Sequence, residues 1–477
     1  MVIRKPQKPP LLKSLMVEFG EPDKLIKILD TMPAEYMPRH YLHWDKLRYL
    51  QPPKGLSAKE WWFALKMQRL GQFRPLPFLD VRGEAFRFFV PDLVQEELHN
   101  IDCGAGGALR VPEPINNPQT RDQYLIRSLM EEAITSSQLE GAVTTREVAK
   151  EMIRTERKPR DKSEQMILNN YITMRHIVEV KDREMTPDLL LELHRLVTEK
   201  TLDDPAMAGK FRRPEQKVVV DDIEGEVYHE PPPAKQLAER CEAMCSFANE
   251  KTPGYFIHPV VRAIILHFWL AYDHPFVDGN GRTARALFYW AMLHRDFWLF
   301  EFISISTILR KAPVKYARSF LYTESDDSDL TYFIVAQTQV IRRAIAELHA
   351  YIDRKTAEVQ ELGSKLKALC LFNHRQAELI RHALKHPYQE YTIESHQKSH
   401  NVVYQTARTD LLQLQTKELL DMEKRGKTMV FRVPRDLAAR LRKLGQGGSK
   451  SVSLLAPSKK TKVKESPPQM YLFGGKK

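Results

Sequence analysis

Cysteine is scarce in this chain of 477 residues, which contains only Cys103, Cys241, Cys245 and Cys370. Cys241 and Cys245 lie four residues apart in a helical stretch, a spacing that suits a metal ion, but no second pair accompanies them. We therefore predict two buried thiols on one helix face rather than a metal site. This cysteine usage fits a reducing environment, and we expect a cytoplasmic protein.

Long apolar runs are also missing. The first 25 residues include basic side chains but no continuous apolar core, so we expect no secretory signal. The most apolar run, residues 260–272, is too short to cross a bilayer and contains Arg262 and His267. These absences exclude a membrane-embedded protein. The length and the recurring helical periodicity instead predict a soluble, mainly α protein of about two to four domains.

Acidic residues do not balance the basic ones, and the formal net charge is +12. From residue 443 onward there is one acid, Glu465, against eight lysines, at positions 443, 450, 459, 460, 462, 464, 476 and 477. This end therefore carries +7 and leaves +5 for the rest, an ordinary balance for a body of this size. The composition predicts a basic, disordered tail over residues 445–477.

One stretch of twelve residues organises the rest of the chain. It joins two strongly apolar segments, so it predicts a tight loop between two buried helices. Its sequence is His274-Pro-Phe276-Val-Asp278-Gly279-Asn280-Gly281-Arg282-Thr-Ala-Arg285. The glycines around Asn280 let backbone amides turn toward an anion at a helix start, and a histidine, a carboxylate and two arginines accompany them. The stretch predicts a phosphate site with a base beside it.

This stretch resembles the signature of the Fic family, His-x-Phe-x-Asp/Glu-Gly-Asn-Gly-Arg-x-x-Arg, and fills every specified position. The resemblance implies a helical Fic-type catalytic domain over residues 111–328. It also implies a nucleotidyltransferase that moves AMP from ATP to a hydroxyl of a protein, with ATP and Mg²⁺ as the small-molecule partners.

The resemblance also implies a role for each residue of the stretch. His274, with a pKa near neutrality, is the general base for an attacking Tyr, Thr or Ser hydroxyl. Asp278 holds Mg²⁺ against the phosphates. The remaining residues bind ATP, with the Gly279, Asn280 and Gly281 turn on the α-phosphate and Arg282 and Arg285 on the β- and γ-phosphates.

A second motif precedes the signature. Ser136-Ser-Gln-Leu-Glu140-Gly141 ends a helix that starts near residue 123, and it resembles the Ser/Thr-x-x-x-Glu-Gly/Asn inhibitory motif of many Fic proteins. A Glu140 that folds over the nucleotide pocket would pair with Arg285 and occupy the space of a γ-phosphate. The plainer interpretation is a helix end with a terminal glycine. Because the signature follows in the same chain, we predict autoinhibition by Glu140.

Residues 210–233 interrupt the helices. Two short extended runs, 217–220 and 227–229, surround an acidic turn and precede three prolines, a pattern that predicts a β-hairpin. In Fic-like proteins a hairpin here is the flap that holds a target protein segment beside the active site by strand pairing. A surface hairpin without a ligand is the alternative. We call residues 210–233 the flap hairpin.

The segments around the catalytic domain carry weaker signals. Residues 1–110 contain a capping box, Ser57 with Glu60, and an alternating run near Phe86, and we predict an extension packed on the catalytic domain. A connecting helix is predicted over residues 329–362, with an apolar stripe that packs within the chain or forms a homodimer.

Residues 366–436 predict a winged-helix domain of three helices and a hairpin that turns at residues 425–427. Tyr404, Gln405 and Arg408 are placed to contact DNA in a major groove, with Arg425 and Lys427 on phosphates. Acidic residues dilute this positive surface, namely Asp410, Glu418, Asp421 and Glu423. The same fold also serves in protein contacts, so both interpretations are kept.

The favoured interpretation is a protein adenylyltransferase inhibited by Glu140, acting on an unknown protein docked at the flap hairpin. Removal of AMP from a modified protein, alone or as a second activity, needs no different residue. A DNA-binding regulator whose Fic domain senses nucleotide is the alternative from another class. The complete set from His274 to Arg285 argues against it, because a sensor has no need of a base.

Overall fold

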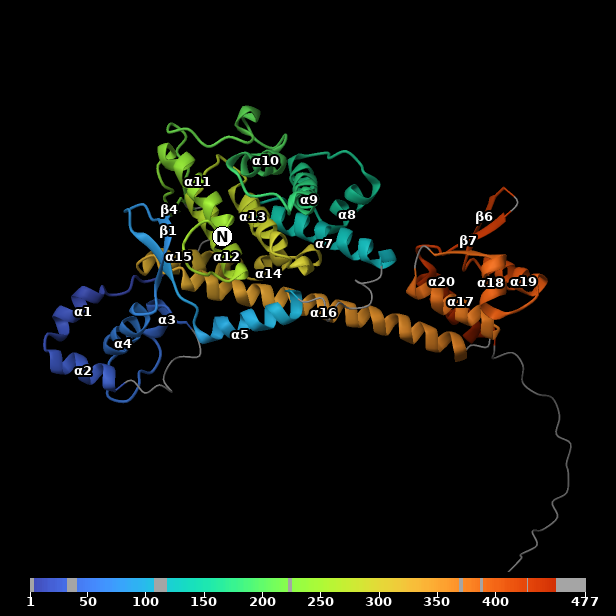
Figure 1. Ribbon diagram of the computed structural model, residues 1–477, viewed down its shortest axis with the longest axis horizontal. Coiled ribbons are helices and arrows are strands. Elements are labelled where there is room, and N and C mark those ends of the chain that lie inside the picture. Colours follow the sequence, from blue (N-terminus) through green and yellow to red (C-terminus); the bar gives the residue numbers. More distant parts are fainter. Residues whose placement is uncertain are drawn as a thin grey trace, which may run out of the picture. The chain divides into compact units, whose positions relative to one another are not determined.

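The computed structural model describes residues 4–31, 41–106, 118–221, 225–368, 372–386, 389–426 and 428–451. The chain divides into two compact units, Met1–Asp353 and Arg354–Lys477. Helices dominate both units, which confirms the predicted mainly α fold (Figure 1).

The N-terminal part of the first unit contains a small helical cluster followed by a hairpin and a helix. These elements are α1 (Leu12–Phe19), α2 (Pro22–Asp30), α3 (Trp44–Leu47), α4 (Ala58–Leu70), β1 (Arg74–Leu79), β2 (Ala85–Phe88) and α5 (Asp92–Ile101). The capping box predicted at Ser57 is present and begins α4. The predicted alternating run forms β2, paired antiparallel with β1. The apolar side chains of β1, β2 and α5 belong to the main core of the unit, whereas α1 to α4 have a core of their own.

The middle of the first unit is a bundle of helices. Its elements are α7 (Pro118–Leu139), α8 (Arg146–Thr155), α9 (Lys162–Val180), α10 (Pro187–Thr198), α11 (Leu237–Ala248), α12 (Pro259–Asp273), α13 (Asn280–His294), α14 (Ile305–Lys311) and α15 (Pro313–Ser325). Short polar side chains start several of these helices, as Thr186 does for α10, where Pro187 takes the first helical position. Cys241 and Cys245 are both buried on α11, as predicted.

Helices α12 and α13 lie at the centre of this bundle (Figure 1). Nearly every side chain of both helices is buried, including Trp269 and Trp290, and a helix that is apolar all round belongs in a protein core. The predicted pair of buried helices is confirmed. Across the described ranges, no helix combines the length and the apolar character that a bilayer crossing requires.

The flap hairpin lies between α10 and α11. Strands β3 (Val220–Asp221) and β4 (Val227–His229) pair antiparallel, with Val220 opposite His229 and an irregular register between the two pairs. The predicted hairpin is therefore present, although its first strand is shorter than the run 217–220. Residues 222–224 of the predicted acidic turn lie outside the described residues.

Helix α16 (Thr331–Ala368) is longer than the helix predicted to end near residue 362. Its apolar stripe, from Ile334 through Ile345 to Ile352, is buried in the core of the first unit. Ile341 shares that core with Leu98 of α5, and Arg342 forms an ion pair with Glu97 at 2.9 Å. The prediction that this stripe packs within the chain is confirmed.

The second unit contains the three helices and the hairpin predicted for residues 366–436. Its elements are α17 (His374–Lys385), β5 (Glu390–Thr392), α18 (Ile393–His400), α19 (Tyr404–Thr416), β6 (Asp421–Arg425), β7 (Thr428–Arg432) and α20 (Leu437–Ser451), and the strand order is β5-β7-β6. Helix α20 extends to Ser451 and so includes residues 445–451 of the predicted tail, whose disorder stays a prediction. Residues 452–477 of the predicted tail lie outside the described residues.

Helix α7 is fixed at its middle by a buried carboxyl group. Glu132 is 1% exposed and accepts hydrogen bonds from Tyr289 on α13 at 2.9 Å and from Ser304 at 2.9 Å. The backbone N–H of Ser306 donates a further bond at 3.1 Å. These bonds tie α7 to α13 and to the start of α14, so the end of α7 is set relative to α13.

Replacement of Glu132 by alanine should destabilise the first unit, because several buried donors lose their acceptor at once. We expect a loss of about 3 kcal/mol in the free energy of unfolding. Denaturant titration measures it. Glu151→Ala on the exposed face of α8 is the matched control and should change the value by less than about 0.5 kcal/mol. Equal effects of the two variants would contradict this account of Glu132.

Candidate active site

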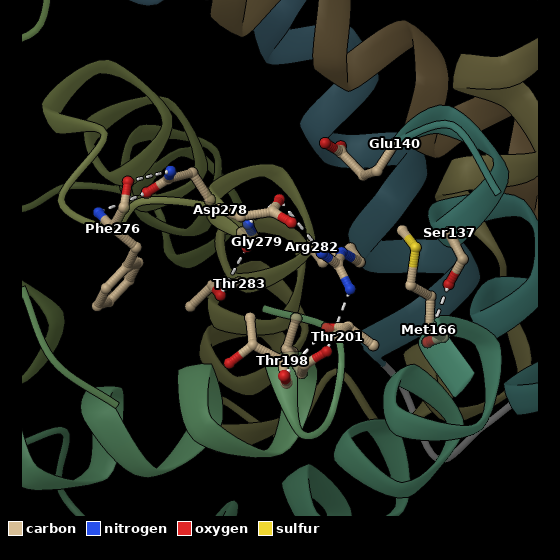
Figure 2. Close-up of polar contacts among 12 residues, drawn as sticks. Ser137, Glu140, Met166, Thr198, Thr201, Phe276, Asp278, Gly279, Arg282 and Thr283 are labelled. Carbon is tan, nitrogen blue, oxygen red and sulfur yellow. Dashed lines mark hydrogen bonds and ion pairs between the residues drawn. The ribbon is translucent and has the colours of Figure 1, made fainter. Parts of the chain in front are cut away.

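The site is the turn of residues 274–279, which joins α12 to α13. His274 ends α12 with a left-handed φ of 45°, and Gly279 begins α13 with φ 82°. Asn280 braces the turn from inside: its Oδ1 accepts from the backbone N–H of Phe276 at 3.0 Å, and its Nδ2 donates to the Phe276 carbonyl at 2.9 Å (Figure 2). Both ends of this side chain are used within the turn.

The Asn280 side chain has a structural role in this arrangement, because both ends of its amide pair with the backbone of Phe276. An amide NH2 has two N–H groups and the bond to Phe276 uses one, so the predicted contact of Asn280 with a phosphate stays a prediction. The backbone of α13 offers further donors to an anion. The first N–H groups of a helix have no partner within it, and they lie at the positive end of its dipole. In α13 these groups belong to the residues around Gly281.

His194 of α10 supports the turn from the opposite side. Its ring stacks on Phe276 with centroids 3.7 Å apart and an interplanar angle of 5°. Its Nε2 donates to the Asp278 carbonyl at 3.0 Å, and its Nδ1 accepts from the Gly209 N–H at 3.0 Å. Burial lowers the pKa of His194 to about 4, so the ring is neutral and supplies the one donor and one acceptor that these bonds need. A lone histidine within an apolar stripe was its only signal in the sequence.

His274 is a neutral imidazole with a defined tautomer. Its Nδ1 lies 3.1 Å from the Ala271 carbonyl and donates its proton there, which leaves Nε2 as the proton acceptor. Burial lowers its pKa to about 4, and the positive charges of His229 and Arg212 act in the same direction. The predicted pKa near neutrality is therefore wrong, because the sequence did not show how far the ring is desolvated. At neutral pH the imidazole is free to accept a proton.

The two arginines of the signature are buried and differently engaged. Arg282 is fully buried, and it donates to the Val197 carbonyl at 3.1 Å and to Asp278 at 3.4 Å (Figure 2). Within the part of the chain that the structure describes, its Nε is buried and has no hydrogen-bond partner. Arg285 donates from Nε to Ser136 Oγ at 2.8 Å and from Nη2 to the Ser136 carbonyl at 3.0 Å. These are desolvated cations directed at one site.

Glu140 reaches this site from the end of α7. It pairs with Arg285 at 2.8 Å, as predicted. A Cβ atom added to Gly281 would lie 2.2 Å from Glu140 Oε1, so the carboxylate rests directly against the first turn of α13. Figure 2 shows the Glu140 side chain extending toward the side of the site where Asp278 and Arg282 lie. An anion thus occupies the helix start at which the sequence predicted a phosphate.

The end of α7 also satisfies the plainer interpretation of the inhibitory motif. Gly141 has φ 93° just after the helix ends, and Ser137 donates to the Met166 carbonyl at 3.2 Å (Figure 2). Gln138 donates to the Thr144 carbonyl at 2.9 Å. The glycine ends the helix, and the glutamate before it faces Arg285. The two interpretations describe the same geometry.

The first arm of the flap hairpin is attached to the turn. Arg212 donates from its backbone N–H to the Pro275 carbonyl and from Nε to the His274 carbonyl, both at 2.9 Å. Phe211 stacks on Phe276 with centroids 5.9 Å apart. The sequence did not single out Arg212, because its partners are more than sixty residues away.

Asp278 offers a carboxylate to the solvent side of the site. Its side chain is 48% exposed, and its Oδ1 accepts from the Gly279 N–H. Mg²⁺ is usually held by one or two carboxylates together with substrate phosphates and waters. A single carboxylate beside two arginines fits a metal that arrives with a nucleotide. Over the described ranges, no group of three potential side-chain ligands could hold a metal alone.

In the second unit, the residues predicted to contact DNA lie at the start of α19. Tyr404 is 55% exposed, Gln405 is exposed and Arg408 is half-buried. Asp410 does not dilute the surface charge as predicted, because it is buried and pairs with Arg375 at 2.7 Å.

Two residues of the hairpin in the second unit, Arg425 and Lys427, were predicted to contact phosphates. Arg425 donates to both carboxylate oxygens of Glu390, at 3.0 and 2.8 Å. Its predicted place on a phosphate is therefore taken by a carboxylate of the chain itself. Lys427 lies outside the described residues.

Comparison with known proteins matches the region around the turn. Residues 184–292 match the model of the Fic/DOC family. The protein adenylyltransferase Fic of Nematostella vectensis is 36% identical over 107 residues, 22% of this chain and 22% of that protein. The protein of the same name from Drosophila virilis is 37% identical over 111 residues, 23% of this chain and 20% of that protein. The matched segment spans about a fifth of the length of these relatives.

Among solved structures, a Fic family protein from Desulfovibrio desulfuricans G20 aligns with a TM-score of 0.46 at 21% identity. The alignment covers 71% of this chain and 96% of that chain.

The close packing of the turn predicts a cost for any side chain at Gly279. A Cβ there would lie 2.6 Å from Thr198 Cγ2. Gly83 has a similar φ of 84° with nothing within 4 Å, so Gly83→Ala isolates the backbone cost. We expect Gly279→Ala to lower the free energy of unfolding by about 1–3 kcal/mol more than Gly83→Ala. Thermal and denaturant unfolding measure the difference. Equal losses of stability in the two variants would show that the turn moves to accommodate the added methyl group.

Proposed function

We propose that this chain, whose residues 184–292 match the model of the Fic/DOC family, transfers AMP from ATP to a hydroxyl side chain of a protein. The observation that carries the proposal is the position of the Glu140 carboxylate, which lies against the start of α13 and pairs with Arg285. The neutral imidazole of His274 lies at the other end of the turn that leads into α13. The site binds an anion and presents a proton acceptor beside it. The names of the relatives support AMP as the transferred group.

The proposed reaction uses the groups of the turn as follows. The hydroxyl oxygen of the target attacks the α-phosphorus of ATP, and its proton passes to His274 Nε2. The bond between the α-phosphorus and the oxygen that bridges to the β-phosphate breaks, and pyrophosphate leaves. Backbone N–H groups at the start of α13 stabilise the charge that develops on the α-phosphate. Mg²⁺, held by Asp278 and the phosphates, would neutralise charge on the leaving pyrophosphate.

The arginines bind the rest of the triphosphate in this proposal. Arg282 has a buried Nε that a phosphate oxygen would satisfy. Arg285 remains oriented by its two bonds to Ser136 even when Glu140 is absent. Glu140 competes with the nucleotide for Arg285 and for the helix start, so its displacement precedes productive binding. The pair of Glu140 with Arg285 supports autoinhibition of the chain.

The place of Glu140 also favours removal of AMP as a second activity. Its carboxylate acts electrostatically on His274 as well as pairing with Arg285. A water molecule oriented by this carboxylate would give a proton to it and attack the phosphorus of the AMP-modified side chain. The bond between the phosphorus and the side-chain oxygen would break, and this oxygen would take a proton from Nε2 of a His274 ring that enters the step protonated. Loss of AMP from a labelled target in the presence of unmodified chain, and its absence with Glu140→Gly, tests this activity.

Glu140→Gly should raise transfer from ATP labelled on the α-phosphate by at least about a hundredfold, because Arg285 and the start of α13 are released from an internal anion. Autolabelling and labelling of lysate proteins measure it. Label from the γ position should not transfer. Equal α-labelling by the two forms would reject autoinhibition by Glu140, and transfer of the γ-label would reject AMP transfer.

His274→Ala in the Glu140→Gly background should abolish labelling while ATP binding, measured by calorimetry, is kept. The imidazole carries the proton, whereas the phosphate groups contact other side chains. Persistent labelling would show that His274 is not the base.

The transfer rate should also report the pKa of His274. The neutral ring is the active form, so the rate falls only as the pH drops through about 4, where the ring becomes protonated. We expect a flat profile between about pH 5.5 and 7, measured with Glu140→Gly in buffers of constant ionic strength. A midpoint near 6.5 would show a solvated histidine instead.

A further inference from the structure

His229, in strand β4 of the flap hairpin, has both ring nitrogens engaged by acceptors. Its Nε2 lies 2.7 Å from the Tyr272 carbonyl, and its Nδ1 lies 2.8 Å from Glu324 Oε2. The ring is buried, at 9% exposure, and packs on the Tyr272 ring with centroids 4.5 Å apart. A neutral imidazole has one N–H and can serve only one of these oxygens. The geometry therefore requires two N–H groups on His229.

The partners of His229 belong to elements that frame the active site. The Tyr272 carbonyl lies in the last turn of α12, two residues before His274, and Glu324 lies in α15. The last carbonyls of a helix lack partners within it and carry the negative end of its dipole, so a cation is favoured there. His229 thus joins β4, α12 and α15 at one point.

We propose that His229, bonded through both ring nitrogens to the Tyr272 carbonyl and to Glu324, is a positioning residue that locks the second arm of the flap hairpin to the turn carrying His274. This inference rests on the proposed transfer of AMP. The first arm is already bound to the same turn by Arg212, through the carbonyls of His274 and Pro275. The two arms of the flap hairpin are thus attached on both sides of His274. The attachment of the second arm depends on the ion pair of His229 with Glu324.

The charged groups around His229 support its double protonation. Burial opposes the charge, but the hydrogen bond and the negative charge of Glu324 outweigh it, and the pKa of His229 is raised above its ordinary value. Asp273 on α12 adds negative charge, although Arg240 of α11 pairs with it at 2.6 Å. Arg212 and His274 also face this region. Tyr272 is a neutral phenol, because burial raises its pKa.

The sign of the pH dependence follows from the raised pKa. The lock is complete at and below the ordinary pKa of histidine, and it weakens as the pH rises through the higher pKa of the folded chain. Loss of one proton leaves either Glu324 or the Tyr272 carbonyl facing a lone pair. The second arm of the flap hairpin then loosens, and the turn keeps only its attachment to the first arm through Arg212. The transfer rate should therefore decline on the alkaline side, at a pH that Glu324 determines.

The test compares Glu140→Gly with Glu140→Gly/Glu324→Gln in the full chain. Glutamine keeps the shape and one acceptor oxygen but removes the charge that favours the second proton. With α-labelled ATP as probe, the maximal autolabelling rate at pH 8 should fall about tenfold relative to the parent, with an unchanged KM for ATP. The alkaline limb should move to lower pH by about one unit. Glu192→Gln, which removes the carboxylate 3.0 Å from His176, is the matched control and should leave the profile in place.

Two further measurements do not depend on catalysis. Nitrogen-15 spectra of labelled histidine, assigned with His229→Gln, should show two N–H groups on His229 at pH 7 in the unmodified chain and one in Glu324→Gln. Amide exchange of residues 227–229 should be faster in Glu324→Gln at pH 7. A singly protonated His229 in the unmodified chain, or an unshifted rate profile in Glu324→Gln, would overturn the proposal. If Glu140→Gly transfers no label at all, the proposed function fails, whereas the spectra still decide whether the lock exists.

Discussion

Near-complete burial of the α12–α13 pair is the constraint on which the site depends. Both helices are packed on nearly every face, so the turn between them cannot shift without disturbing the core. Within this frame, Phe276 stacks on His194, and Asn280 forms two hydrogen bonds with the backbone of Phe276. Residues with no part in proton transfer therefore determine where His274 and the start of α13 point.

Desolvation gives the site its chemical character. Arg282 and Arg285 are buried and the His274 ring is partly buried, and burial disfavours the charged form of all three groups. Burial keeps His274 neutral, because it outweighs the opposing effect of the Glu140 carboxylate on the pKa of the ring. Arg285 stays charged beside Glu140 and two oxygens of Ser136, so the site remains cationic. A neutral base next to fixed positive charge suits an anionic electrophile and a neutral nucleophile.

The sequence predicted the parts of this structure that local patterns encode. The signature placed the turn, the start of α13 and both arginines correctly, and the inhibitory motif predicted the pair of Glu140 with Arg285. Apolar stripes predicted the buried helices and the inward face of α16.

Features that depend on distant partners were not predictable. Arg212 and His194 meet the turn only after more than sixty residues of intervening chain have folded, and neither belongs to a local motif. The pKa of His274 depends on burial that no single helix reveals, and so does the pairing of Asp410 with Arg375 in the second unit. The structural role of Asn280 was also missed, because its bonds to the Phe276 backbone were not visible in the sequence.

The attachment of α7 at Glu132 has a mechanical consequence. Glu132 lies two helical turns before Glu140, and its bonds to Tyr289 and Ser304 hold the helix there. Release of the Glu140 carboxylate from Arg285 therefore requires only that the final turn of α7 unwind, while the rest of the helix stays in place.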